Sequence, residues 1–177
     1  MTTSSNTRWV LGASLVATAL ITGCAGLPGS STGIPITMPA KNCAELNGFT
    51  LASAAIGLPT TGAAVTSAVV VPAAGAGMAA VAEYCKVLGD INPVDPEAPK
   101  IKFQVNLPGN WNGKAVMFGG GGYNGVLATG LANVPAGPTD KPAPLARGYA
   151  TFGSDSGHQA NANGSRDGTF GANDEAL

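Results

Sequence analysis

A run of four glycines, residues 119–122, is the first stretch of this chain whose residue types could serve chemistry. Glycine has no Cβ and adopts positive φ angles easily, so the backbone can turn sharply and leave its N–H groups uncovered. Bare N–H groups at the end of a strand can bind an anion or stabilise a developing oxyanion. The alternative is a tight packing turn beneath another element, and the glycines alone leave both interpretations open.

The second such stretch is Ser-Asp-Ser-Gly-His at residues 154–158, which contains the residue types of a hydrolase triad. A nucleophile elbow requires Gly-x-Ser-x-Gly, whereas Gly153 and Gly157 here flank Asp155. Triad side chains also come from separate regions of the chain, so that they converge in space. We therefore predict that Asp155 and His158 hold neighbouring loops by hydrogen bonds and take no part in a triad.

Two cofactor hypotheses find little support. Gly120, Gly122 and Gly125 satisfy the G-x-G-x-x-G dinucleotide pattern, and Asp140 follows at the expected distance. That acidic residue should end a second strand, but Asp140 lies in a proline-rich loop. The residues therefore predict no dinucleotide.

The support for a metal site is equally weak. The chain has one histidine and no zinc-ligand spacing. A calcium site built from Asp155, Asp167 and Asp174 has no other feature in its favour. We predict neither a metal nor a cofactor.

The elements that position the two stretches are short apolar runs. Residues 115–118 are apolar and stop at the glycines, which predicts a buried strand. Residues 148–153 form the next apolar strand and end at the Ser-Asp-Ser-Gly-His run. In α/β sheets the carboxyl ends of strands form the edge where ligands bind.

Upstream residues predict more strands. Residues 84–88 and 69–71 each predict one, the latter ending at Pro72. Residues 101–107 alternate apolar with polar side chains, which predicts a half-buried strand. The Pro/Gly-containing turn at 108–113 favours antiparallel pairing of that strand with residues 115–118. Helical turns are expected at residues 42–48, 126–131 and 173–177.

The N-terminus predicts export. Residues 1–23 combine Arg8 with an apolar segment too short to span a bilayer, as in a signal peptide. Small residues before Cys24 match a bacterial lipobox, which would anchor the chain to a membrane through an acylated Cys24; ordinary secretion with nearby cleavage is the alternative. Residues 24–41 are rich in Gly, Ser and Pro and predict a flexible tether. The expected location is periplasmic or extracellular.

The chain length of 177 residues suits a single domain, and the net charge of -1 gives no basic footprint for nucleic acid. Apart from Cys24, two cysteines remain, Cys43 and Cys85. An even pair in an exported protein suggests a disulfide, with two free buried thiols as the alternative.

Several of these pieces, taken in order, resemble the tannase and feruloyl esterase family of secreted serine esterases. The pieces that carry the resemblance are Cys43, residues 84–87, 101–105, 107–113 and 119–125, and Arg147 through His158. The resemblance covers residues 42–177 and implies the N-terminal part of an α/β-hydrolase domain, with early antiparallel strands followed by parallel ones.

The resemblance also implies roles for residues. The glycine turn would donate oxyanion-hole N–H groups, with Gly121 and Gly122 as the candidates. Cys43 and Cys85 would form the family's N-terminal disulfide, and Asp155 and His158 would belong to a structural loop. The family's serine elbow, acid, base, inserted lid and later strands lie beyond the matching region, so no triad residue is assigned here.

We therefore expect an N-terminal fragment of an exported ester hydrolase that acts on a small, aromatic ester and is inactive alone. The alternative is a lipid-anchored binding or structural module without catalytic function.

Overall fold

The computed structural model describes residues 41–134 and 137–172. They belong to one compact unit that spans Pro39–Leu177. The predicted signal peptide, Cys24, nearly all of the tether and the helical turn expected at 173–177 lie outside the described residues.

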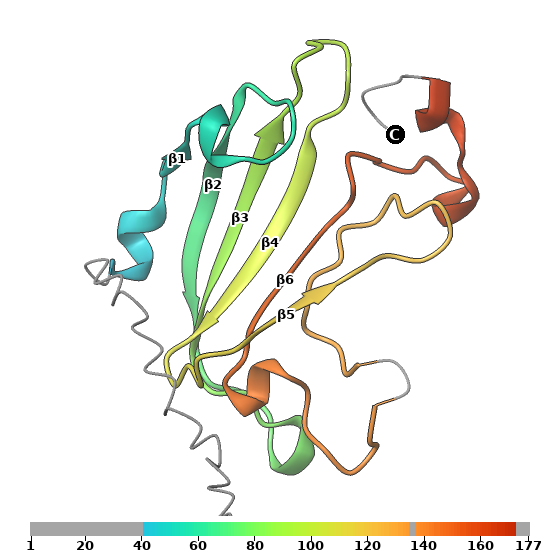
Figure 1. The fold of residues 1–177 in the computed structure, drawn as a ribbon. Helices are drawn as coiled ribbons and strands as arrows, with labels where there is room; N and C mark the ends of the chain where they lie inside the picture. Colours follow the sequence, from blue (N-terminus) through green and yellow to red (C-terminus); the bar gives the residue numbers. More distant parts are fainter. Residues whose placement is uncertain (1–40, 135–136, 173–177) are drawn as a thin grey trace, which may run out of the picture. The chain divides into compact units, whose positions relative to one another are not determined.

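The described residues form a six-stranded mixed sheet with the strand order β1-β2-β3-β4-β6-β5 (Figure 1). The strands are β1 (Thr50–Leu51), β2 (Gly62–Val71), β3 (Tyr84–Asn92), β4 (Ile101–Pro108), β5 (Ala115–Phe118) and β6 (Ala150–Ser154). The helices of the described part are short 3₁₀ turns: η1 (Cys43–Leu46), η2 (Ser53–Ala55), η3 (Gly77–Ala79), η4 (Leu145–Arg147), η5 (Gly164–Arg166) and η6 (Thr169–Ala172). The sheet is of the kind that a partial α/β-type domain contains.

Strands β2, β3 and β4 form an antiparallel meander. The strand predicted before Pro72 is confirmed, and β2 ends at Val71. The helical turn expected at 42–48 is also confirmed as η1. Val65, Ala68 and Val87 form a small buried cluster against which the side chains of η1 pack.

A disulfide joins Cys43 of η1 to Cys85 of β3, with 5.6 Å between their Cα atoms. The two cysteines pack against the same buried cluster. The bond therefore fastens the first described turn of the chain to the central sheet.

The predicted antiparallel pair of β4 and β5 is wrong. Strand β6 lies between them, antiparallel to β4 and parallel to β5. The connection at residues 109–114 passes over one strand, a step of about 10 Å, which six residues span easily. A short Pro/Gly link therefore did not require a hairpin.

The prediction that residues 115–118 are buried is also wrong. β5 alternates between exposed and half-buried side chains, and Met117 is 66% exposed. In the described part of the chain β5 pairs with β6 alone, so its other edge and much of its surface are uncovered.

The alternation along β4 is present, but its buried positions are polar. Gln104 and Asn106 are 4% and 0% exposed, whereas Leu107 is 38% exposed. The polar face is buried because residues 126–130 lie across it. Those residues form no helix, contrary to the helical turn expected at 126–131.

Among the residues that the structure describes, no helix combines the length and the apolarity that crossing a membrane requires.

Candidate functional site

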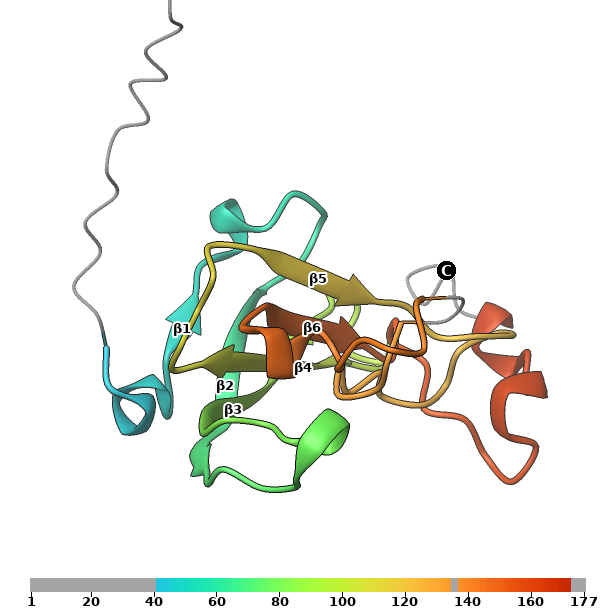
Figure 2. The same ribbon diagram turned by 90° about the horizontal axis from the view of Figure 1, so that it is seen from below.

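The two stretches singled out in the sequence lie at the same end of the sheet. Because β5 and β6 are parallel and pair Phe118 with Gly153, their carboxyl ends lie side by side. Figure 2 shows the loops that follow both strands gathered at this end. This arrangement brings residues 119–125 next to residues 154–160, as later contacts confirm.

The glycine run ends in a tight turn. The N–H of Asn124 donates to the carbonyl oxygen of Gly121 at 2.9 Å, and Gly122 has a φ of 61°. A positive φ at the second residue of a turn favours glycine. Within the described residues, the N–H groups of Gly120, Gly121 and Gly122 donate to no acceptor of the protein.

These N–H groups lie beside an open hollow of about 510 Å³. One wall consists of the glycines and Asn124, and the other consists of Val126, Leu127 and Ala128. The hollow thus combines uncovered N–H donors with apolar side chains. That pairing suits a ligand with one anionic oxygen and an apolar body.

Neighbouring glycines of the turn have different surroundings. A Cβ on Gly120 would lie 1.9 Å from Oδ1 of Asn124, whereas a Cβ on Gly121 would meet nothing within 4 Å. A side chain at position 120 would therefore force the side chain of Asn124 to move. Packing does not require a glycine at position 121, where the backbone faces open space.

The loop after β6 clamps the glycine turn at three points. Nδ1 of His158 lies 2.8 Å from the carbonyl oxygen of Tyr123, and the N–H of Ala160 donates to the carbonyl oxygen of Gly125 at 3.0 Å. Nδ2 of Asn124 donates to Oγ of Ser156 at 2.6 Å. The loop after β6 thus holds residues 123–125 of the turn in place.

Asp155 is fully engaged in holding its own loop. It is 1% exposed, and its Oδ1 accepts hydrogen bonds from the N–H groups of Lys102 and Gly157. The side-chain amide of Gln159 donates to Oδ2. The carboxylate therefore ties the loop to the start of β4 through Lys102, Gly157 and Gln159.

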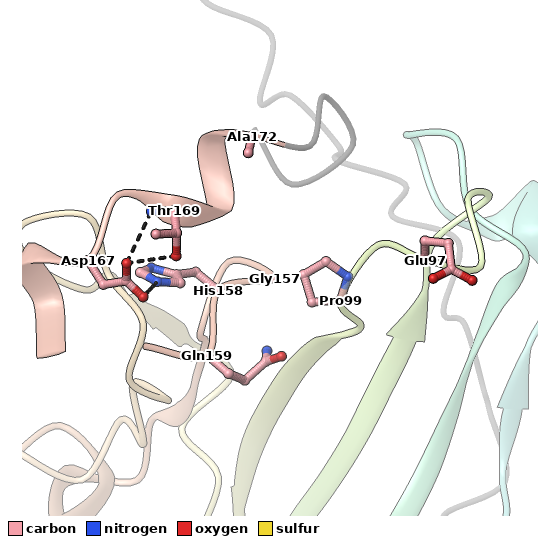
Figure 3. Close-up of a pocket in the computed structure, with 8 residues that line it drawn as sticks. All are labelled: Glu97, Pro99, Gly157, His158, Gln159, Asp167, Thr169 and Ala172. Carbon is pink, nitrogen blue, oxygen red and sulfur yellow. Dashed lines mark hydrogen bonds and ion pairs between the residues drawn. The ribbon is translucent and has the colours of Figure 1, made fainter. Parts of the chain in front are cut away.

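The second partner of His158 is Asp167, which the sequence analysis considered only as a calcium ligand. Nε2 of His158 lies 3.5 Å from Oδ2 of Asp167, and both side chains are buried. Oδ1 of Asp167 accepts from Oγ1 and N–H of Thr169 at 2.7 and 3.1 Å. Figure 3 shows these three residues together at one side of a second hollow, with Glu97 at the opposite side.

The hydrogen bonds from Thr169 stabilise the carboxylate form of Asp167. They are the main reason that the pKa of Asp167 falls from 3.8 to about 2, with smaller contributions from Asn161 and His158. Desolvation acts in the opposite direction but is outweighed. Asp167 is therefore a charged anchor of the loop that packs against His158.

Sequence reasoning also missed a buried polar cluster formed by Gln104, Asn106 and Thr151. Asn106 and Thr151 are register partners on β4 and β6. The sequence signal that could have revealed the cluster is a pair of uncharged side chains, Gln104 and Asn106, on alternate positions of one strand. Such amides tolerate burial when they find hydrogen-bond partners.

The described residues contain no group of three or more His, Cys, Asp or Glu side chains placed to hold a metal ion. Of the three aspartates considered for calcium, Asp174 lies outside the described residues. Asp140, the dinucleotide candidate, is exposed in a loop and lies 3.3 Å from Nζ of Lys141.

Comparison with known proteins identifies relatives of this arrangement. Residues 85–177 match the family model for tannase and feruloyl esterase. The chain is 48% identical over 140 residues to an uncharacterized esterase of Agrobacterium fabrum, an alignment that covers 76% of this chain and 24% of the relative. It is 35% identical over 95 residues to mono(2-hydroxyethyl) terephthalate hydrolase of Piscinibacter sakaiensis, covering 52% of this chain and 15% of the relative. The chain thus spans about a quarter of the first relative's length and less of the second's.

Proposed function

This chain belongs to the tannase and feruloyl esterase family, and from that premise we propose that it supplies the oxyanion-binding part of a carboxylic ester hydrolase. The observation that carries the proposal is the glycine turn. The N–H groups of Gly120, Gly121 and Gly122 donate to no acceptor among the described residues, and they lie beside an open hollow at the carboxyl end of parallel strands. Gly121 and Gly122 are the proposed donors.

In this role the turn acts on an ester whose carbonyl carbon is attacked by a serine. The carbonyl oxygen then carries negative charge, and N–H groups beside it would stabilise the tetrahedral intermediate. One such donor typically changes kcat by about 10²–10³. The turn needs no rearrangement for this, because His158, Ser156 and Ala160 already hold it in place.

We propose that residues 42–177 form the first part of an α/β-hydrolase domain in a longer protein. The serine elbow, the acid, the base, the inserted lid and the later strands would come from residues outside this sequence. The uncovered edge of β5 in the described part is where a further strand would pair. The apolar wall of the hollow and the name of the Piscinibacter relative favour a small aromatic ester as substrate.

We also propose that the protein is exported. Residues 1–23 would be a signal peptide, Cys24 a lipidated anchor, and residues 24–41 a tether to the membrane surface. The Cys43–Cys85 disulfide supports a periplasmic or extracellular location, because such bonds persist in oxidising compartments.

The proposal is tested with a 4-nitrophenyl ester, using the 177-residue chain and a longer protein that carries it. We expect turnover by the longer protein and none by the chain alone. In the longer protein, Gly121→Ala adds a methyl group beside the hollow while keeping the N–H, and it should lower kcat by up to about 10²-fold by moving the oxyanion away from that donor. The matched control is Gly57→Ala, because Gly57 also has open space around its Cβ position but lies away from the hollow. Turnover by the chain alone, or full activity of Gly121→Ala, would overturn the proposal.

A further inference from the structure

The hollow beside the glycine turn has a second wall, residues 126–130, which we call the wall segment. It belongs to no helix or strand, yet Val126, Leu127 and Ala128 line the hollow. Two hydrogen bonds attach its backbone to the sheet. The N–H of Ala128 donates to the carbonyl oxygen of Ser154 at 3.2 Å, and the carbonyl oxygen of Thr129 accepts from Nδ2 of Asn106 at 2.8 Å.

The second attachment comes from a side chain at the centre of the sheet. Asn106 is 0% exposed, and its Nδ2 also donates to Oγ1 of Thr151 at 2.9 Å. Its Oδ1 accepts from Nε2 of Gln104 at 2.8 Å. Because the carbonyl oxygen of Thr129 only accepts, these partners fix which side of the amide faces the wall segment.

The wall segment lies directly on the strands beneath it. A Cβ on Gly153 of β6 would meet the carbonyl oxygen of Ala128 at 2.3 Å. Gly130, at a φ of 69°, would place a Cβ 3.1 Å from Oγ1 of Thr151 and 3.3 Å from Nδ2 of Asn106. With no layer of side chains between them, a change at Asn106 is transmitted directly to the wall segment.

Stability alone does not explain three polar side chains at these positions. Replacing all partners of a buried hydrogen-bonded group by apolar side chains of similar shape is often close to neutral. A specific amide, however, fixes one position of the backbone that it holds, whereas apolar packing tolerates sliding.

We propose that Asn106 is a positioning residue for the hollow: by holding Thr129 it sets the distance between the wall segment and the glycine turn. The inference depends on the proposed function only for the identity of the ligand. In the ester hydrolase it would fix the width available to the ester beside the N–H donors.

The test is amide hydrogen exchange measured by NMR on the ¹⁵N-labelled 177-residue chain. In Asn106→Leu the exchange of the Ala128 N–H should become about tenfold faster, the effect of one lost hydrogen bond, and the amide signals of Gly120–Gly122 should shift. Exchange at Val65, whose N–H is hydrogen-bonded to Phe49 on the far side of β2, two strands from Asn106, should not change. Gln104→Met is the matched control, because it removes another bond of Asn106 and keeps the contact with Thr129.

A purely structural role predicts a different pattern. Equal acceleration at Ala128 and Val65, an unchanged Ala128 rate, or an equal effect of Gln104→Met would each overturn the proposal. If Asn106→Leu does not fold, Asn106→Ser is measured with the same criteria, because serine is too short to reach Thr129 but leaves a hydroxyl in the cluster. The exchange rates do not depend on ester binding. This test can therefore fail while the proposed function stands, and the proposed function can fail while Asn106 still positions the wall segment.

Discussion

Nδ1 of His158 lies 2.8 Å from the carbonyl oxygen of Tyr123, and this contact joins the loop after β6 to the glycine turn after β5. A carbonyl oxygen only accepts, so Nδ1 carries the hydrogen of this bond. The other ring nitrogen faces Oδ2 of Asp167 at 3.5 Å. The single histidine of the chain therefore lies between the glycine turn and the anchored loop of Asp167.

Two substitutions separate the contacts of His158. His158→Asn keeps a donor near the position of Nδ1, whereas His158→Gln places its donor near the position of Nε2. We expect His158→Gln to loosen the glycine turn and to speed exchange of the Asn124 N–H about tenfold, since one hydrogen bond is lost. His158→Asn should change this rate much less.

Both substitutions remove the imidazole ring. A loss of packing would therefore affect the two variants equally, and only the hydrogen bond to Tyr123 distinguishes them. Equal rates for the Asn124 N–H in the two variants would show that the ring volume, and not the bond to Tyr123, holds the turn.

Asp167 makes the free energy of unfolding depend on pH in the acid range. Its pKa in the folded chain, about 2, lies below its ordinary value of 3.8, so the carboxylate form stabilises the fold. That contribution is complete above about pH 4 and is lost as the pH falls toward about 2. The urea midpoint of the wild-type chain should therefore fall over this range more than that of Asp167→Asn.

Thr169→Val removes the hydroxyl that contributes most to this shift, so its midpoint should fall less over this range than that of the wild type and should level off at a higher pH. Asp140→Asn, at an exposed position, is the control and should follow the wild-type curve. A wild-type curve parallel to that of Asp167→Asn would contradict this account.

The glycine turn should tolerate a methyl group at one position and not at its neighbour. Gly120→Ala forces the side chain of Asn124 away, and overpacking of this kind costs about 1–3 kcal/mol. Gly121→Ala should leave the free energy of unfolding within about 0.5 kcal/mol of the wild type, like a surface substitution. Urea unfolding of both chains measures the difference, and equal losses would disprove the assignment of the two positions.

The disulfide should stabilise the chain by closing a 42-residue loop. Replacing Cys43 and Cys85 by serine should lower the free energy of unfolding by about 2–4 kcal/mol. A reducing agent should lower the stability of the wild type similarly and leave the double variant unchanged. Cys24→Ser should have no effect on unfolding, and a reductant-sensitive double variant would be inconsistent with this pairing.

The sequence located five of the six described strands, β2 and β3 only in part, and it did not reveal all of their neighbours. Val71 before Pro72 and Phe118 before the glycines mark strand ends correctly, because proline and glycine act locally. The place of β6 between β4 and β5 depends on pairing of Asn106 with Thr151, residues distant in the sequence. Local pattern carries no information about such contacts.

The sequence also did not show which face of β4 is buried. Alternation shows that two faces differ, but burial of the polar face follows from the wall segment that covers Asn106. The exposure of Met117 likewise follows from the place of β5 at the edge of the described sheet. These properties belong to the tertiary arrangement, and the sequence pattern of either strand alone does not contain them.

The central claim is that the N–H groups of the glycine turn receive an anionic oxygen. The most direct test is a titration of the ¹⁵N-glycine-labelled chain with phenylphosphonate, a tetrahedral anion with an aromatic ring, followed by NMR. We predict that the amide signals of Gly121 and Gly122 move progressively at millimolar concentrations, that acetophenone, which lacks the anion, leaves them in place, and that Gly121→Ala suppresses the response. Amide signals that stay unchanged in the turn, or that move equally at exposed glycines such as Gly57, would contradict the claim.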